Sequence, residues 1–485
     1  MGKPRSTAAE AKNRFWFVPA VLAFAAVLLF FLTQYLDQIV ETRLSRLPVF
    51  FSGGATAARS VLSTIAGSLI TVVATIFSVT VVTLQLAASN YSPRLLRNFI
   101  SDRGVQAVLG TYIATFLYSL LVLRIIRAPE SEGAEFNPVI SVTVAVLLAL
   151  LCVALLIYFI AHVVNLIQSS TIVERAHADT TESLGRLDDL EDAGEEVPDD
   201  PWERPDLAGL LEKETLVVRA ETSGYVQVLD LDALANAALG GEGAKGPAVV
   251  EVPFAPGAFV AAGLAVARVW RDPRLGDGSA DAVRSAIHLG EERSFRQDFA
   301  FGLRQLSDIA LKGLSPGVND PTTAMQAMDR IEAIFVALGA KALPARVKTL
   351  RVDGSEVIVR AEHHSFEDVA GLAFDQIRRA AFTSGQVAVL ERQIEILGRA
   401  IDANALPDRR RSLWSRVFSI ARLAPEQVPD PEDAANLAAR AAEVGRRLTG
   451  TGLAPHVGAD LKELVAATAD LPGGHRVREA ADAPG

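Results

Sequence analysis

The chain has 485 residues, of which 50% are hydrophobic, and it carries a formal net charge of −10. Nearly all of the long apolar runs lie before residue 170, whereas the longer remaining part has the composition of an acidic soluble domain. The single cysteine, Cys152, excludes an intrachain disulfide and a zinc site built on paired cysteines. Because the basic residues are scattered, the sequence has no basic cluster of the kind that binds nucleic acid.

Four apolar stretches each satisfy the requirement of about 20 residues for a helix that crosses a bilayer. They run approximately from Phe15 to Tyr35, from Val61 to Leu86, from Val105 to Leu123 and from Val139 to His162. The first stretch is too long for a signal-peptide core and has no small-x-small cleavage site after it. The sequence therefore predicts a retained anchor followed by three further spans.

The positively charged residues of the short connections predict the orientation of these spans. The N-terminal arm and the connection between the second and third spans carry Lys3, Arg5, Lys12, Arg14, Arg94, Arg97 and Arg103. The opposite connections carry Arg43, Arg46, Arg59, Arg124 and Arg127. This bias favours a cytoplasmic N-terminus, and four crossings then place the C-terminal domain in the cytoplasm as well.

The second span carries a regular line of polar side chains. At about 100° per residue, one arc of the helix contains Ser60, Thr64, Ser68, Thr71, Thr75, Ser78, Gln85 and Ser89. One interpretation is a packed helix seam, because small polar residues permit close approach and their hydroxyls bond the preceding turn. The other is a water-filled path, in which several copies surround an axis and the hydroxyls replace part of a permeant's hydration shell. The candidate pore-lining residues are Thr64, Ser68, Thr71, Thr75, Ser78 and Gln85.

The segment after this span, NYSPRLLRNFISDRG, is basic and amphipathic. An interfacial helix whose arginines contact anionic lipid explains this pattern. The functional alternative is a basic collar at the cytoplasmic mouth of a path, with Arg94 and Arg97 as its candidate residues.

After the fourth span, the sequence predicts a helical extension. We expect the fourth span and this extension to form one continuous helix. The acidic run LDDLEDAGEEVPDD at residues 187–200 is typical of a solvated linker. From about Thr215, alternating apolar residues separated by glycines and prolines predict a small β module, with tight bends at Gly224, Gly257 and Gly263. The pattern resembles the half-barrels of lipoyl and biotinyl domains, although the lysine that those domains modify is absent. A hairpin is predicted around Gly354.

The motif LSPGVNDPTTA lies between two predicted helices and has the highest density of turn-forming residues in the chain. Asp320 is a natural N-cap for a helix that starts at Pro321, because its carboxylate can accept from the free amides there. The alternative is a ligand or subunit contact that uses the exposed amides of that helix end. The candidate residues for such a contact are Ser315, Asn319, Asp320 and Thr322.

Two stretches carry a resemblance to a known family. SVTVVTLQLAASNYSPRLLRNFISDRGVQAVLGTYIATFLYSLLVLR and SDIALKGLSPGVNDPTTAMQAMDRI are similar to the bacterial predicted membrane proteins grouped as domain-of-unknown-function family 2254. The resemblance implies a protein of the bacterial inner membrane with the same plan of spans. It implies no activity and no catalytic residue.

Together these patterns predict an α-helical membrane protein with four transmembrane helices and a C-terminal cytoplasmic α+β domain, which contains a small barrel- or sandwich-like β module. The expected divisions are an N-terminal arm (1–14), the transmembrane domain (15–168), a helical extension with acidic linker (169–210), the β module (211–275), the α+β domain (276–456) and a C-terminal helix with a flexible tail (457–485).

The sequence favours a homo-oligomeric membrane channel or transport protein, whose second spans line a path and whose cytoplasmic domain assembles or gates it. The alternative is a membrane-anchored sensor or scaffold whose cytoplasmic domain binds a partner. An enzyme is not expected, because no GxxxxGK[ST], HExxH or GxSxG motif occurs. The expected partners are the lipid bilayer, further copies of the chain and a small inorganic ion; no cofactor, metal or nucleic acid is expected.

Overall fold

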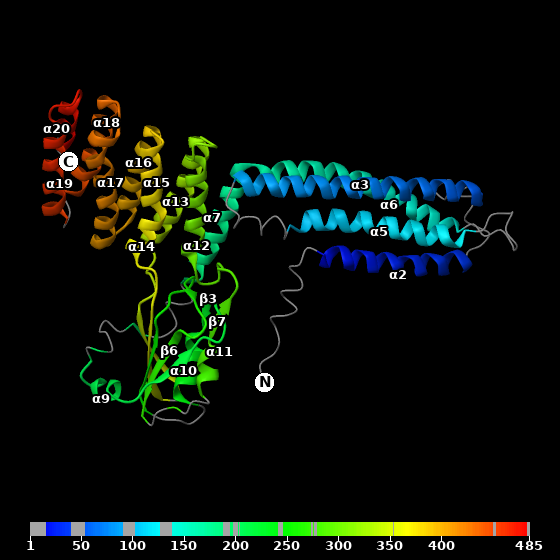
Figure 1. Ribbon diagram of the computed structural model, residues 1–485, viewed down its shortest axis with the longest axis horizontal. Helices are drawn as coiled ribbons and strands as arrows, with labels where there is room; N and C mark the ends of the chain where they lie inside the picture. Colours follow the sequence, from blue (N-terminus) through cyan, green and yellow to red (C-terminus); the bar gives the residue numbers. More distant parts are fainter. Residues whose placement is uncertain are drawn as a thin grey trace. The chain divides into compact units, whose positions relative to one another are not determined.

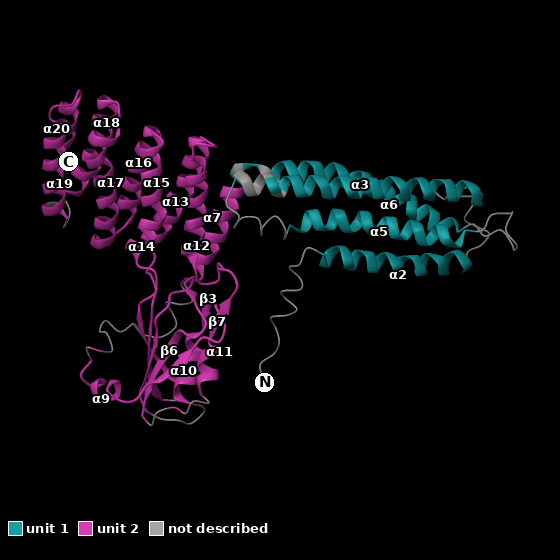
Figure 2. Cartoon of the chain, in the orientation of Figure 1, with its two compact units in different colours: residues 1–171 teal, residues 172–485 magenta. Residues whose placement is uncertain are grey.

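The computed structural model divides the chain into two compact units, Met1–Thr171 and Ile172–Gly485 (Figure 2). The structure describes residues 16–39, 54–90, 102–126, 138–187, 195–196, 202, 204–240, 246–272, 275, 279–352, 354–449 and 453–482. The expected N-terminal arm, the segment with Arg94 and Arg97, and most of the acidic run lie outside these residues.

The first unit contains four helices that are long and apolar enough to cross a membrane. They are α2 (Phe17–Ile39), α3 (Ala55–Asn90), α5 (Arg103–Ile125) and α6 (Val139–Ile167) (Figure 1). The four predicted stretches therefore form helices that could each cross a membrane. Helix α3 begins before the apolar run at Val61, because the alanines and serines ahead of it continue the backbone hydrogen bonds of the helix.

Helix α5 forms the centre of this unit. In the 18-residue apolar stretch of α5, 44% of the residues are buried. The corresponding share is 17% in each of the other three helices. Tyr118 of α5 lies in a core to which α2 contributes Phe30, α3 contributes Leu62 and α6 contributes Val142. The three outer helices bury only one face each, so most of their apolar surface is available to lipid.

A break separates α6 from the next helix. Gln168 has an extended backbone (φ −65°, ψ 128°), so α6 ends at Ile167 and α7 (Ser169–Gly185) starts anew. The expectation of one continuous helix is therefore wrong. Within the second unit, Glu174 of α7 pairs with Arg330 at 2.9 Å, which joins α7 to the helices described below.

The second unit contains an open six-stranded mixed sheet with the order β1-β8-β9-β4-β6-β2. Its strands are β1 (Glu195–Glu196), β2 (Leu216–Arg219), β4 (Ala248–Val252), β6 (Ala265–Arg271), β8 (Val347–Val352) and β9 (Ser355–Ala361). All neighbours pair antiparallel except β4 and β9, which pair parallel. A three-stranded sheet in the order β5-β3-β7 consists of β5 (Phe259–Val260), β3 (Gly224–Leu229) and β7 (Ile287–Gly290).

No closed barrel occurs in the described part of the chain, so the expected barrel-like module is wrong. The physical reason lies in β4, whose two edges are both occupied. One edge pairs with β6, and the other pairs with β9, where Ala248 lies beside Val357 and Val252 beside Ala361. The strands between residues 211 and 275 therefore join an open sheet that later residues complete.

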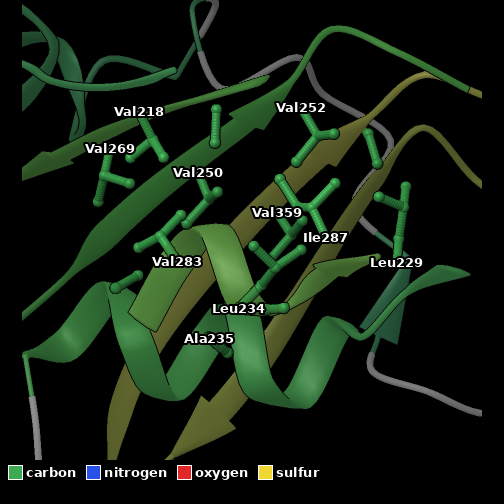
Figure 3. Close-up of a cluster of buried hydrophobic side chains, with 14 of the residues drawn as sticks. Val218, Leu229, Leu234, Ala235, Val250, Val252, Val269, Val283, Ile287 and Val359 are labelled. Carbon is green, nitrogen blue, oxygen red and sulfur yellow. The ribbon is translucent and has the colours of Figure 1, made fainter. Parts of the chain in front are cut away.

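The main core of the second unit lies on one face of the six-stranded sheet (Figure 3). Two helices, α10 (Leu231–Leu239) and α11 (Ala280–Ser285), cover this face. Figure 3 shows strand side chains directed at these helices, among them Val218, Val250, Val269 and Val359 against Leu234 and Val283. The opposite face packs on the short helix α9 (Ala208–Leu211) through a smaller cluster with Val249, Trp270 and Ile358.

Glycines shape the bends between these strands. Gly257 and Gly263 have φ values of +87° and +88°, which confirms the tight bends predicted there, since L side chains rarely adopt this region. Gly224, the third predicted bend, is instead the first residue of strand β3 and pairs with Val260 of β5. Gly354, with φ +78°, confirms the predicted hairpin between β8 and β9.

The remaining helices lie side by side (Figure 1). They are α12 (Phe299–Gly313), α13 (Pro321–Gly339), α14 (Phe366–Ala370), the π-helix η5 (Gly371–Asp375), α15 (Gln376–Thr383), α16 (Val387–Ala403), α17 (Pro407–Gln427), α18 (Pro431–Leu448), α19 (Ala454–Ala467) and α20 (Gly474–Asp482). Helix α20 packs on α18 and Arg476 pairs with Glu432 at 3.0 Å, so residues 474–482 are helical where the composition predicts a flexible tail.

Candidate functional site

The candidate pore-lining residues lie along one exposed face of α3. This hydroxyl face, as we name it, consists of Thr64, Ser68, Thr71, Thr75, Ser78 and Gln85, all of which are exposed in the single chain. The Thr64, Ser68, Thr71 and Thr75 hydroxyls donate to the carbonyl oxygen one turn earlier, at 2.8, 2.8, 3.1 and 3.1 Å. Because these hydrogens are used within the helix, the hydroxyls present oxygen lone pairs outward.

The other faces of α3 have different surroundings. A second face packs against α5 and α6 and is buried, with Leu62 at 0%, Leu69 at 6% and Ile76 at 2% exposure. A third face carries large apolar side chains that are open to the surroundings, with Ile70 at 48% and Phe77 at 55% exposure. Within the described part of the single chain, the hydroxyl face is therefore not packed against another helix.

An apolar groove borders the hydroxyl face. It has a volume of about 390 Å³ and runs between α3 and α6, lined by residues that include Val72, Thr75, Val79 and Phe159. Thr75 thus belongs both to the hydroxyl face and to the rim of this groove. The candidate mouth residues Arg94 and Arg97 lie outside the described residues, so the expected basic collar stays a prediction.

Asp37 forms a buried polar centre that the sequence analysis missed. The carboxylate, in a residue that is 6% exposed, accepts from the backbone amides of Ile140 and Ser141 at 2.7 and 3.0 Å. It also accepts from the Ser141 hydroxyl at 2.6 Å. Helix α6 starts after Pro138, which offers no side-chain cap, so α2 supplies the cap from a separate helix. In the sequence, the site is indicated only by an aspartate at the end of an apolar run. Its partners, Ile140 and Ser141, lie 103 and 104 positions further along the chain, so only the fold shows the contact.

A second missed polar centre joins the start of α5 to the last turns of α6. Asp102 caps α5 by accepting from the amide of Val105 at 3.0 Å, and its oxygen also lies 2.8 Å from Nε2 of His162. The Tyr158 ring stacks on His162 with ring centres 5.2 Å apart. These contacts fix the register of α5 against α6.

Three of the contact candidates, Ser315, Asn319 and Asp320, lie in the turn between α12 and α13, and Thr322 lies in the first turn of α13. The Asp320 carboxylate accepts from the amide of Thr323 at 3.0 Å and from its hydroxyl at 2.5 Å, which confirms the predicted N-cap. Asn319 has a positive φ of +48° and accepts from Nε2 of Gln386 at 3.1 Å. Thr322 is exposed and Ser315 is half-buried. A ligand or subunit contact at this turn stays a prediction.

We expect Asp320→Ala to lower the free energy of unfolding by about 0.5–2 kcal/mol, the usual cost of losing an N-cap. Asp320→Asn is expected to be nearly neutral, because its amide oxygen still caps the helix. The hydroxyl and amide of Thr323 lower the pKa of Asp320 below its ordinary value. The carboxylate's contribution is therefore complete above the ordinary aspartate pKa of about 4 and is lost as pH falls through the lower folded pKa. Chemical denaturation at pH 7 and pH 3 measures both effects; an equal loss of stability at the two pH values would contradict the assignment.

A polar hollow of about 480 Å³ lies on the face of the six-stranded sheet that carries α9. Its lining residues are Trp202, Glu251, Arg268, Trp270 and Arg360. Glu251 pairs with both arginines at 2.8 Å, and the two indole rings meet edge to face with centres 5.4 Å apart. In the described residues no group of histidine, cysteine, aspartate and glutamate side chains has the arrangement of a metal site.

Residues 12–399 match the family described as predicted membrane protein (DUF2254). The chain belongs to this family. It is similar to the uncharacterized protein Mb1321c of Mycobacterium bovis, with 34% identity over 410 residues that cover 82% of this chain and 75% of the relative. The uncharacterized protein Rv1290c of Mycobacterium tuberculosis gives the same identity and coverage. No solved structure matches the chain.

Membership of DUF2254 confirms the resemblance seen in the two sequence stretches, and it supports a membrane protein whose environment is a lipid bilayer. The match includes the four membrane helices, both sheets and the helices up to the last turn of α16. Helices α17 to α20 lie beyond the matched residues.

Proposed function

We propose that this DUF2254 protein is a homo-oligomeric membrane channel or transport protein, in which the α3 helices of several copies line a path. The second unit assembles or gates the path, and the role is transport rather than catalysis. The observation that supports this proposal is the hydroxyl face of α3, which is polar, exposed in the protomer and separate from the face that packs on α5 and α6.

The dimensions and chemistry of the hydroxyl face suit a path. From Thr64 to Ser78 the helix rises by about 21 Å at about 1.5 Å per residue, which is most of a hydrocarbon core about 30 Å thick. The outward oxygen lone pairs can replace part of the hydration shell of a small inorganic ion. Ile70 and Phe77, on the third face, suit contact with lipid tails.

A packed seam between copies is the competing use of the same face, since small residues allow close helix approach. A particle image of the purified protein separates the two. The channel proposal predicts a ring of copies with α3 facing an open axis. Single copies, or copies joined through α3 with a closed axis, would contradict it.

We further propose that both termini are cytoplasmic and that the membrane is the bacterial inner membrane, as the lysine and arginine bias indicates. A reporter fused after Gly485 is expected to behave as cytoplasmic, and one inserted at Gly133 as external. Protease digestion of the second unit from outside intact cells would overturn this orientation.

A membrane-anchored sensor or scaffold is the second candidate, and the hollow beside Trp202 and Trp270 favours it. Aromatic rings and paired charges in one concavity are features of ligand-binding and partner-binding surfaces. This role predicts single copies that bind a partner and carry no ion flux.

A further inference from the structure

The apolar groove between α3 and α6 has a buried floor and an open mouth. Ile76, Phe159 and Val163 line the groove and are buried, so they form its floor. Ile160 and Val164 line it as well but are exposed, so they stand at its mouth. Both helices are among the four that could cross a membrane. Packing within the single chain therefore shapes the groove but does not fill it.

The chemistry of the groove excludes a polar occupant. Among the lining residues, all of which the structure describes, Thr75 has the one polar side chain. Its hydroxyl donates to the Thr71 carbonyl oxygen at 3.1 Å, so this hydrogen is used within α3. The lining side chains therefore offer no hydrogen-bond donor to a ligand. Because a polar group buried without a partner is costly, the groove suits a hydrocarbon.

The groove lies within one half of the membrane thickness. On α3 it extends from Val72 to Val79, in the second half of the apolar span Ala55–Thr83. On α6 it extends from Leu156 to Val164, in the second half of the span Val139–Asn165. At about 1.5 Å per residue, these stretches are about 11 and 12 Å long. One leaflet of a hydrocarbon core about 30 Å thick is about 15 Å deep, so the groove matches most of the length of one acyl chain.

The mouth of the groove is continuous with the exposed apolar surface of α6. Ile160 and Val164 belong to the groove, and the neighbouring Ile157 is exposed outside it. In a bilayer, acyl chains surround these side chains. An empty slot of about 390 Å³ would forfeit the dispersion contacts of its lining atoms, and a flexible chain can enter from the adjoining lipid to restore them. A chain that lies along the helices fits this slot better than a side chain that points across it.

We propose that the groove between α3 and α6 binds one acyl chain of a phospholipid, from the leaflet at the C-terminal ends of these two helices. The groove selects the chain and not the headgroup, because its lining offers no donor to a polar group. The site depends on the membrane environment and not on a water-filled path along α3. The bound chain lies beside Thr75, which also belongs to the hydroxyl face.

Native mass spectrometry of the full-length protein in a maltoside detergent tests this site by counting retained phospholipids. The alkyl chain of the detergent competes for the groove, so a retained phospholipid reports a specific site. We expect the wild type to retain phospholipid. Val79→Phe and Val164→Phe should each lose one phospholipid per chain, because the added ring fills the groove from α3 or from α6. Val81→Phe is the matched control, since Val81 is exposed on α3 outside the groove, about 200° around the helix from Val79, and it should retain the wild-type number.

A second arm uses the wild type and does not depend on the folding of a variant. Phosphatidylglycerol and phosphatidylethanolamine with the same long acyl chains should raise the unfolding temperature by similar amounts, whereas short-chain phospholipids with these headgroups should not. Val79→Phe should abolish the rise and Val81→Phe should keep it.

Three results would overturn the lipid site. They are a wild type that retains no phospholipid, groove variants that retain as many phospholipids as the wild type, and a rise in unfolding temperature that follows the headgroup instead of the chain length. If both groove variants split an oligomer while the phospholipid number stays the same, the groove holds a second copy of the chain and not a lipid.

Discussion

Replacing Asp37 with alanine is expected to lower the free energy of unfolding of the membrane unit by about 2–6 kcal/mol, because two backbone amides lose their acceptor at about 1–3 kcal/mol each. The carboxylate accepts three hydrogen bonds from Ile140 and Ser141. Without it, the amides of Ile140 and Ser141 lose their acceptor. Each buried donor left unsatisfied costs about 1–3 kcal/mol.

Unfolding by a graded detergent titration, followed by circular dichroism, measures this loss. Asp37→Asn keeps one acceptor oxygen and should lose about half as much as alanine. Thr33→Val removes the 2.9 Å contact with the Tyr118 hydroxyl and the 3.1 Å hydrogen bond to the Phe30 carbonyl, and should cost about 1 kcal/mol. A loss below about 1 kcal/mol for Asp37→Ala would show that water or lipid headgroups cap α6 instead.

Replacing Thr71 with leucine is expected to reduce ion flux through the protein in liposomes by about tenfold or more, a change that needs only about 1.4 kcal/mol of added barrier. Thr71 lies within the hydroxyl face, where its oxygen points outward. Leucine removes that acceptor, narrows the path and favours dewetting of an apolar constriction.

Two control variants make the flux measurement specific. Thr71→Ser keeps the hydroxyl and should retain most of the flux. Phe77→Leu changes an exposed apolar side chain on the third face of α3 and should leave the flux unchanged. Flux of potassium and of chloride is measured separately, and the oligomer is checked for each variant. If Thr71→Leu breaks the oligomer instead, the hydroxyl face is a packed seam.

The membrane helices, the hydroxyl line, the N-cap at Asp320 and the hairpin at Gly354 could be predicted because each depends on neighbours in sequence. Apolar length defines a span, a period of about 3.6 residues defines a helix face, and local side chains define a cap. The open sheet could not be predicted, because the parallel pairing of β4 with β9 joins segments that are remote in the chain. The strand pattern alone is compatible with closure into a barrel.

The polar sites that the sequence analysis missed also depend on contacts between segments that are remote in the chain. Asp37 caps a helix that starts at Val139, and Asp102 at the start of α5 lies 2.8 Å from Nε2 of His162 in the last turns of α6. Each residue looks ordinary in its own segment: an aspartate at the end of an apolar run, and an aspartate just before one. Their environment arises only from tertiary packing, which also decides whether a polar group has a partner.

Reaction of single cysteines with a polar, membrane-impermeant thiol reagent tests the central claim most directly, in a Cys152→Ala background. Thr71→Cys and Thr75→Cys should react, because a thiolate forms where water can solvate it. Ile76→Cys should stay protected by packing, since Ile76 is 2% exposed, and Ile70→Cys should stay protected by lipid although Ile70 is 48% exposed in the protomer. Equal protection of Thr71→Cys, Thr75→Cys and Ile76→Cys in an active, intact oligomer would contradict a water-filled path along α3.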